Sequence, residues 1–151
     1  MKYIYTLLLA LLFGATQAQI VINEVDADQN GTDATEFVEL YGTPGTSLNG
    51  YVLVFFNGAN NQSYLTVDLS GNSIPASGYY VVGNAAVANL NQTINGNVIQ
   101  NGADAIGLFQ AAAAAWPNAT AVSATGLVDA IVYGTGDAAA ATLIATLTPG
   151  Q

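Results

Sequence analysis

The stretch from Ile20 to Tyr41 constrains the fold more than any other part of the chain, because it joins two strand-like runs through a crowded acidic loop. The runs cover Ile20 to Val25 and Glu36 to Tyr41 and are rich in side chains that favour strands. Six of the ten acidic residues of the protein fall within this stretch. The pattern predicts a hairpin whose loop either binds a cation or tolerates strong repulsion between carboxylates.

The N-terminal residues have the three-part pattern of a secretory signal peptide. Lys2 supplies the basic region, Ile4 to Phe13 form an apolar run, and Gly14 to Ala18 supply the small residues before the cleavage site. The apolar run is shorter than the ~20 residues that a membrane span needs. We therefore expect a signal peptide at 1–18 and a single domain at 19–151, secreted or held at the cell surface, with no membrane insertion after cleavage.

The charge of the expected mature chain excludes several functions. Its ten acidic side chains have no Lys, Arg or His beside them, because Lys2 is the only basic residue of the protein. Direct nucleic-acid binding is excluded, since phosphate contacts depend on Lys and Arg. Without His, Cys or a second Lys there is no Ser-His or Cys-His nucleophile pair and no thiolate zinc site. Carboxylate chemistry remains: a hard cation held by oxygens, or a glycosidase-like acid pair.

Beyond the hairpin, short strand-like runs alternate with turn residues, which is typical of an all-β sandwich or barrel. Tyr51 to Phe56 is a continuous apolar run and predicts a strand buried on both faces. Ser63 to Leu69 alternates, which predicts that Tyr64 and Thr66 share one face of a half-buried strand. Asp137 to Leu147 has high helix propensity, with Asp137 as its cap. We expect further strands at 79–83, 97–100, 104–110 and 127–133, a surface loop at 84–97 and a helical turn at 111–115.

Five segments, taken in order, resemble the bacterial secreted form of the lamin tail domain family. They read VINEVDADQNGTDATEFVELYG, LNGYVLVFFNG, DLSGNSIPASGYYVVGN, VIQNGADAIGLFQ and LVDAIVYGTGD. The resemblance implies an immunoglobulin-like β-sandwich that acts as an accessory module rather than an enzyme, of the kind found beside nuclease, phosphatase or other hydrolase domains. Members of the family usually continue into a closing strand, whereas this sequence ends at Gln151. We expect either a piece of a longer protein or a sandwich that closes differently.

The acidic loop matches the start of a calcium-binding loop. Asp26-x-Asp28-x-Asn30-Gly31 fits its first six positions, where alternate side chains converge on one point and the glycine takes the sharp turn. The bidentate Glu of that loop belongs at the position of Phe37, so the match is incomplete. The sequence predicts a variant Ca²⁺ site, and a solvated acidic turn remains the alternative. The predicted ligands are Asp26, Asp28, Asn30, Asp33 and Glu36.

Strand periodicity places Glu39 on one face of its strand with Phe37 and Tyr41, and Glu36 on the other face. One of the two carboxylates is therefore expected to be partly buried. A catalytic pair of Glu24 or Glu39 with Glu36 is disfavoured, because so short a chain builds no large substrate cleft. The aromatic residues either form a sugar-binding face or pack in the core, and strand spacing favours the core. They are Tyr51, Phe55, Phe56, Tyr64, Tyr79, Tyr80 and Trp116.

Three hypotheses of function follow. The first is a non-catalytic, secreted module of lamin-tail type that contacts protein or cell-surface glycan, with Ca²⁺ in the acidic loop as a stabilising ion. The second is a calcium-dependent carbohydrate-binding module. The third is the N-terminal part of a larger exported hydrolase, of nuclease or phosphatase type, with an adjoining catalytic domain.

Overall fold

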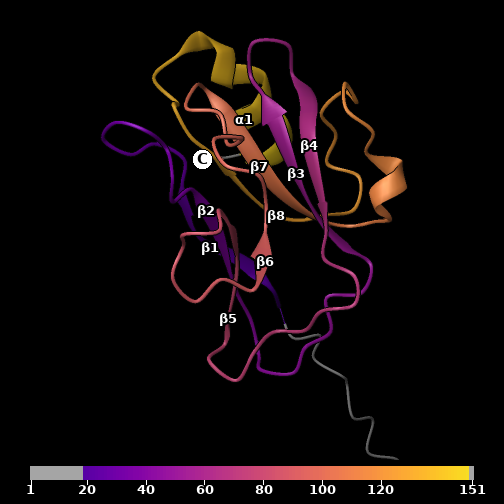
Figure 1. The fold of residues 1–151 in the computed structure, drawn as a ribbon. Helices are drawn as coiled ribbons and strands as arrows, with labels where there is room; N and C mark the ends of the chain where they lie inside the picture. Colours follow the sequence, from indigo (N-terminus) through magenta and orange to yellow (C-terminus); the bar gives the residue numbers. More distant parts are fainter. Residues whose placement is uncertain (1–18, 150–151) are drawn as a thin grey trace, which may run out of the picture.

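The computed structural model describes residues 19–149, which form two facing four-stranded sheets (Figure 1). The first sheet has the order β1 (Val21–Asp26), β2 (Phe37–Tyr41), β5 (Tyr79–Gly83) and β6 (Gln92–Thr93). The second has the order β4 (Gln62–Asp68), β3 (Tyr51–Asn57), β7 (Asp104–Gln110) and β8 (Leu127–Val132). Every strand pair is antiparallel except β5 with β6. The predicted all-β sandwich is confirmed, and the predicted signal peptide lies outside the described residues.

Strand β3 is buried on both faces, as its apolar run predicts. Leu53 and Phe55 belong to the core between the two sheets. Val54 and Phe56 belong to a second apolar cluster, on the outer face of the second sheet. Burial on both faces removes the whole run from water, and each large side chain buried this way stabilises the fold by about 1.5–3 kcal/mol.

The outer face of the second sheet is covered by α1 (Ala141–Leu147), which follows the 3-10 turn η2 (Ala138–Ala140), and by Trp116 after the turn η1 (Ala113–Ala115). Leu143 and Leu147 are the buried side chains of α1. The Asp137 carboxylate accepts a hydrogen bond from the Ala139 N–H at 2.8 Å, as expected for a cap. The C-terminal helix therefore covers the outer face of the second sheet. No helix within residues 19–149 has the length and apolar character needed to cross a membrane.

The strand predicted at 97–100 is wrong, and β6 lies at Gln92–Thr93 instead. Asn97 has a φ of 54°, which interrupts an extended run. The N–H of Val98 donates to the Glu36 carboxylate at 3.0 Å rather than to a neighbouring strand. Side-chain hydrogen bonding therefore replaces strand pairing in this segment.

The predicted alternation of the 63–69 strand is also wrong at Tyr64. Phe55 pairs with Leu65 and Phe56 pairs with Ser63, so Tyr64 is the extra residue of a β-bulge. The bulge turns Tyr64 toward the core between the sheets, with its ring centroid 6.1 Å from that of Phe55. Thr66 lies on the other side, where its hydroxyl donates to the Trp116 carbonyl oxygen at 2.8 Å.

Candidate functional site

The five predicted calcium ligands lie in three different places. Asp28, Asn30 and Asp33 lie in the loop between β1 and β2, which projects from one side of the sandwich (Figure 1). Asp26 is the last residue of β1, and Glu36 is buried immediately before β2. Among the residues that the structure describes, no three acidic side chains gather closely enough to hold a metal ion. The Ca²⁺ site therefore stays a prediction.

Asn101 is hydrogen-bonded to two carboxylates of this loop, those of Asp28 and Asp33, and the sequence did not indicate this role. Its Nδ2 donates to Asp28 Oδ1 at 3.2 Å and to Asp33 Oδ2 at 3.0 Å. The Gln29 N–H donates to Asp33 Oδ1 at 2.9 Å. The hydrogen bonds from Asn101 and from Gln29 lower the pKa of Asp33, because they favour its ionised form. In the sequence, Asn101-Gly102 has only the signature of a turn, so its link to a loop about seventy residues earlier was not visible.

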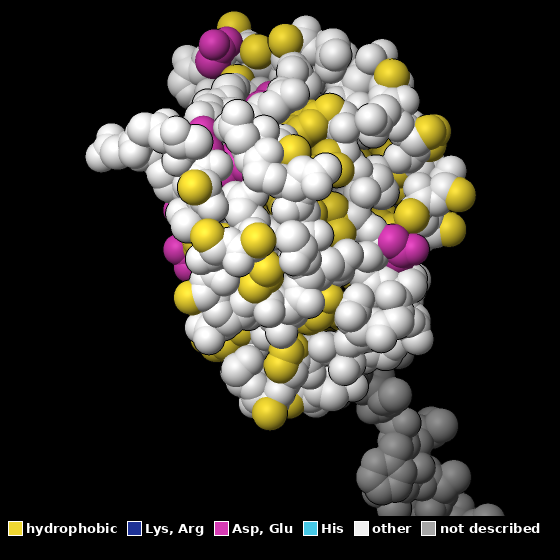
Figure 2. All heavy atoms as spheres, in the orientation of Figure 1, with side chains coloured by type: hydrophobic (Ala, Val, Ile, Leu, Met, Phe, Trp, Pro, Cys, Tyr) yellow, Lys and Arg dark blue, Asp and Glu magenta, His cyan; other side chains and the backbone are white. Residues whose placement is uncertain are grey.

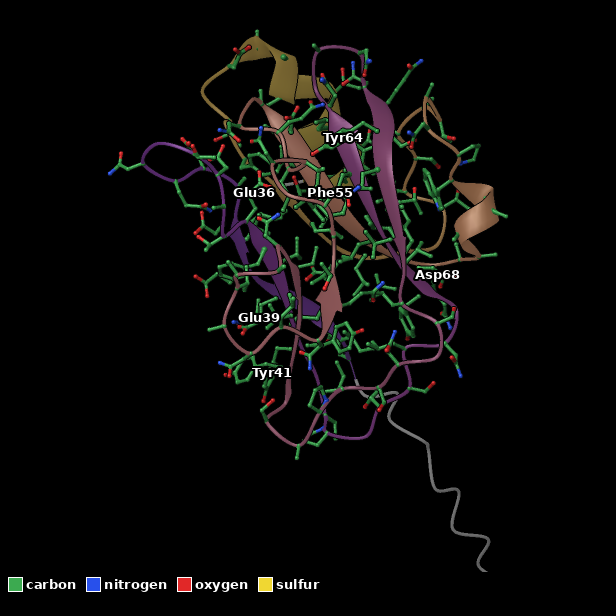
Figure 3. All side chains as sticks on the ribbon, in the orientation of Figure 1. Glu36, Glu39, Tyr41, Phe55, Tyr64 and Asp68 are labelled. Atoms are coloured by element: carbon green, nitrogen blue, oxygen red, sulfur yellow. The ribbon has the colours of Figure 1, made fainter. Side chains whose placement is uncertain are left out.

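Glu36 is the buried one of the two carboxylates that strand periodicity placed on opposite faces of the strand. Its Oε2 accepts the Val98 N–H, and its backbone carbonyl accepts the Asn84 N–H at 3.0 Å. In Figure 3, Glu36 lies at the upper end of the first sheet, at the height of Phe55. Glu36 therefore ties the segment after β6 to β2. It cannot pair with Glu39, which points to the opposite face of the same strand, so the disfavoured catalytic pair of these two is not assembled.

The outer face of the first sheet carries the remaining candidate residues in cross-strand rows. Cross-strand partners project on the same side of a sheet. Glu24 lies opposite Glu39, and Glu39 lies opposite Val81. In the neighbouring rows, Tyr41 lies opposite Tyr79, and Asp26 lies opposite Phe37. We call this surface the acidic-aromatic face, formed by Glu24, Asp26, Phe37, Glu39, Tyr41, Tyr79 and Val81.

The segment from Ala86 to Asn91 forms a wall beside the acidic-aromatic face. Two adjoining hollows, of about 470 and 410 Å³, share Glu39, Val81 and Asn89 among their lining residues. Asn91 fixes the wall to β5, because its N–H donates to the Val81 carbonyl at 2.9 Å and its Oδ1 accepts the Val81 N–H at 2.8 Å. The predicted surface loop at 84–97 therefore contains strand β6 and this wall, whose last residue is hydrogen-bonded to β5. Glu39 lies where the two hollows meet.

Tyr41 and Tyr79 are the most exposed large hydrophobic side chains of residues 19–149, at 49% and 40%. Their ring centroids are 5.3 Å apart and their planes are tilted by 47°. Gly78, at a φ of 85°, lies against Tyr41, since a Cβ there would stand 3.4 Å from the Tyr41 ring. The other aromatic candidates are partly or fully buried, which confirms core packing for Phe55, Phe56, Tyr80 and Trp116.

No cation of the described chain balances the carboxylates of this face. Residues 19–149 contain no Lys, Arg or His, and Figure 2 shows magenta acidic groups with no dark blue among them. Within the face, Asn23 Nδ2 donates to Glu39 Oε1 at 2.8 Å. That neutral hydrogen bond leaves the negative charges of Glu24 and Glu39 opposite one another, an arrangement that destabilises a sheet.

These features define a small β-sandwich of immunoglobulin-like type, with a hollowed and largely acidic surface on one sheet. The sequence profile of the Lamin Tail Domain family matches residues 14–135, most of the chain, and the protein belongs to that family. The resemblance carried by the five strand segments is confirmed. The family is one of non-catalytic, immunoglobulin-like domains, which indicates an interaction module. A search of curated proteins finds no match.

Proposed function

We propose that this protein is a secreted, non-catalytic contact module that binds its partner through the acidic-aromatic face. The observation that carries the proposal is the exposed ring pair of Tyr41 and Tyr79 beside two adjoining hollows. Exposed aromatic side chains present a large rigid contact area and are enriched where proteins bind their partners. The pinned wall at 86–91 keeps the surface concave.

Several features favour binding over catalysis. Residues 19–149 lack the His, Cys and Lys side chains that serve most nucleophilic and acid-base mechanisms. The acidic pair of Glu24 and Glu39 lies on an open sheet face rather than in an enclosed cleft. If the chain is joined to a hydrolase in a longer exported protein, the module would position that catalytic domain against its target.

The proposal is tested by the binding of labelled protein to the surface of the producing cells, measured by flow cytometry. We expect the double variant Tyr41→Ser/Tyr79→Ser to lose at least about tenfold in apparent affinity, because truncating a hot-spot aromatic residue costs about 2 kcal/mol or more. Ile131→Ser is the matched control, since Ile131 is also an exposed apolar residue but lies on β8. Equal binding by the double variant and the parent protein would contradict the proposal.

We also propose that Ca²⁺ binds the loop through Asp28 and Asp33, with Asn101 as a third side chain. One oxygen of each carboxylate lies within hydrogen-bonding distance of the Asn101 amide. Rotating that amide by a half turn exchanges its Nδ2 for Oδ1, which would bring three oxygens toward one point. Ca²⁺ prefers six to eight oxygen ligands, so carbonyls and water would complete the shell.

Melting curves in calcium and in chelator test this site. Ca²⁺ is expected to raise the Tm of the parent protein above its value in NaCl of equal ionic strength, because a ligand that binds only the folded state stabilises it. Asp33→Asn should abolish the difference, whereas Asp68→Asn, on β4, should keep it. Identical melts of the parent protein in calcium and in chelator would exclude the site.

A further inference from the structure

We infer that the acidic-aromatic face binds an arginine side chain presented by an extended segment of another protein. The inference rests on the proposed function, and it adds the chemical identity of the partner. Three features of the face support it: its unbalanced charge, its ring pair and the spacing between them.

The negative charge of the acidic-aromatic face favours a cationic partner. Glu24 and Glu39 are directly opposed on the same side of the sheet, and Asp26 lines the same hollow as both of them. Like charges so placed destabilise the free protein. Since residues 19–149 contain no basic side chain, only a group from outside this part of the chain relieves the repulsion. Charge complementarity therefore favours a positively charged ligand.

The ring pair decides which kind of cation fits. The faces of Tyr41 and Tyr79 attract an organic cation through the ring quadrupole, whereas a hard metal ion needs oxygen ligands that these faces do not offer. A neutral sugar would stack on the rings but would leave the two opposed carboxylates unrelieved. A guanidinium group satisfies both halves of the face, because it stacks on aromatic rings and donates two parallel hydrogen bonds to a carboxylate.

The spacing along β2 suits one long side chain. Glu39 and Tyr41 are two residues apart on the same face, which separates them by about 7 Å. The two hollows meet at Glu39, and the one that contains Tyr79 is bordered by the pinned wall. An arginine that enters along this wall would lay its guanidinium beside the Tyr79 ring with Glu39 within reach.

The test uses the full chain and three fluorescent octapeptides of Gly and Ser. Each carries two copies of one residue at alternate positions: arginine, lysine or citrulline, the neutral analogue of arginine. Binding is measured by fluorescence anisotropy at low and at physiological ionic strength. We expect the arginine peptide to bind most tightly, the lysine peptide several-fold more weakly, and the citrulline peptide at least about tenfold more weakly than arginine, because it lacks the charge.

Two variants locate the site. Glu39→Gln should weaken binding of the arginine peptide about tenfold, because the guanidinium group loses a charge-assisted hydrogen bond to the carboxylate. Asp68→Asn removes one negative charge on β4. Asp68 lies on the opposite side of Figure 3 from Glu39, so this variant should change the affinity for the arginine peptide less than about twofold. Circular dichroism and the Tm of both variants confirm that each one folds.

The outcomes separate the inference from the proposed function. Equal binding of the arginine and citrulline peptides, or equal losses in Glu39→Gln and Asp68→Asn, would overturn the arginine site. A neutral glycan that binds through Tyr79 and is insensitive to Glu39→Gln would also overturn it, while leaving a binding function on this face. Cell-surface binding that is unchanged in the Tyr41→Ser/Tyr79→Ser variant would instead contradict the proposed function itself.

Discussion

At the scale of single residues, the opposed carboxylates of Glu24 and Glu39 should cost the free protein stability. Replacing one charge removes the repulsion, so we expect Glu24→Gln to stabilise the fold by about 0.2–1 kcal/mol. That gain corresponds to a rise in Tm of about 1–4 °C in a domain of this size. Differential scanning calorimetry at low ionic strength measures it. Asp137→Gln is the contrasting control, because it removes a capping carboxylate and should lower the Tm.

Two partly buried tyrosines, Tyr64 and Tyr133, make stability depend on alkaline pH. Burial raises the pKa of Tyr64 to about 12 and raises that of Tyr133 further still. The Tyr133 hydroxyl donates to the Gln100 carbonyl at 2.9 Å, and the Tyr64 hydroxyl accepts the Gln100 N–H at 3.1 Å. In the folded state both phenols stay neutral at pH 10, the pH near which an unfolded tyrosine ionises. The folded state therefore holds these protons more tightly than the unfolded state does.

The sign of the resulting pH effect follows from this proton linkage. The contribution of the two tyrosines is fully present below about pH 10 and is lost as the pH rises from about 10 through 12 and beyond. Each tyrosine contributes a slope of up to about 1.4 kcal/mol per pH unit in its window. Urea unfolding between pH 8 and pH 12 should show this decline, and Tyr133→Phe should make it shallower. An unchanged slope in Tyr133→Phe would contradict the assignment.

At the scale of elements, α1 should be essential to the second sheet. Leu143 is fully buried in the cluster on the outer face of that sheet, together with Phe56 and Phe109. Leu143→Ala opens a cavity there, and we expect a loss of about 2–5 kcal/mol in the free energy of unfolding. Thr142→Ala, at an exposed position of the same helix, should change stability by less than about 0.5 kcal/mol. Urea denaturation of both variants makes the comparison, and similar losses would show that α1 is not packed as described.

The strands with strong local signals were predictable from the sequence, and the features set by distant contacts were not. The apolar run of β3 and the cap at Asp137 each depend on neighbouring residues, and both are confirmed. The bulge at Tyr64 depends on the register between two strands, which no local pattern encodes. The acidic-aromatic face was missed for the same reason. Strand periodicity placed Glu39 beside Tyr41, but only the pairing of β2 with β1 and β5 brings Glu24 and Tyr79 to that surface.

At the scale of the whole molecule, the described chain carries carboxylates and no basic side chain, so its charges repel one another throughout. Self-repulsion destabilises a compact state and is weakened by salt. The same field attracts a cationic partner and is weakened by salt in the same way. Stability and binding should therefore respond to ionic strength in opposite directions.

This opposition can be measured on one sample by raising NaCl from about 10 mM to about 1 M, which shortens the screening length from about 30 Å to about 3 Å. The Tm should rise over this range, because repulsion among the carboxylates is screened. The affinity for the arginine octapeptide should fall, because its attraction to Glu39 and Glu24 is screened as well. In Glu24→Gln both responses should be smaller. A Tm that falls with NaCl would show that carboxylate repulsion does not limit stability, and a salt-independent affinity would show that the peptide is held by the tyrosine rings alone.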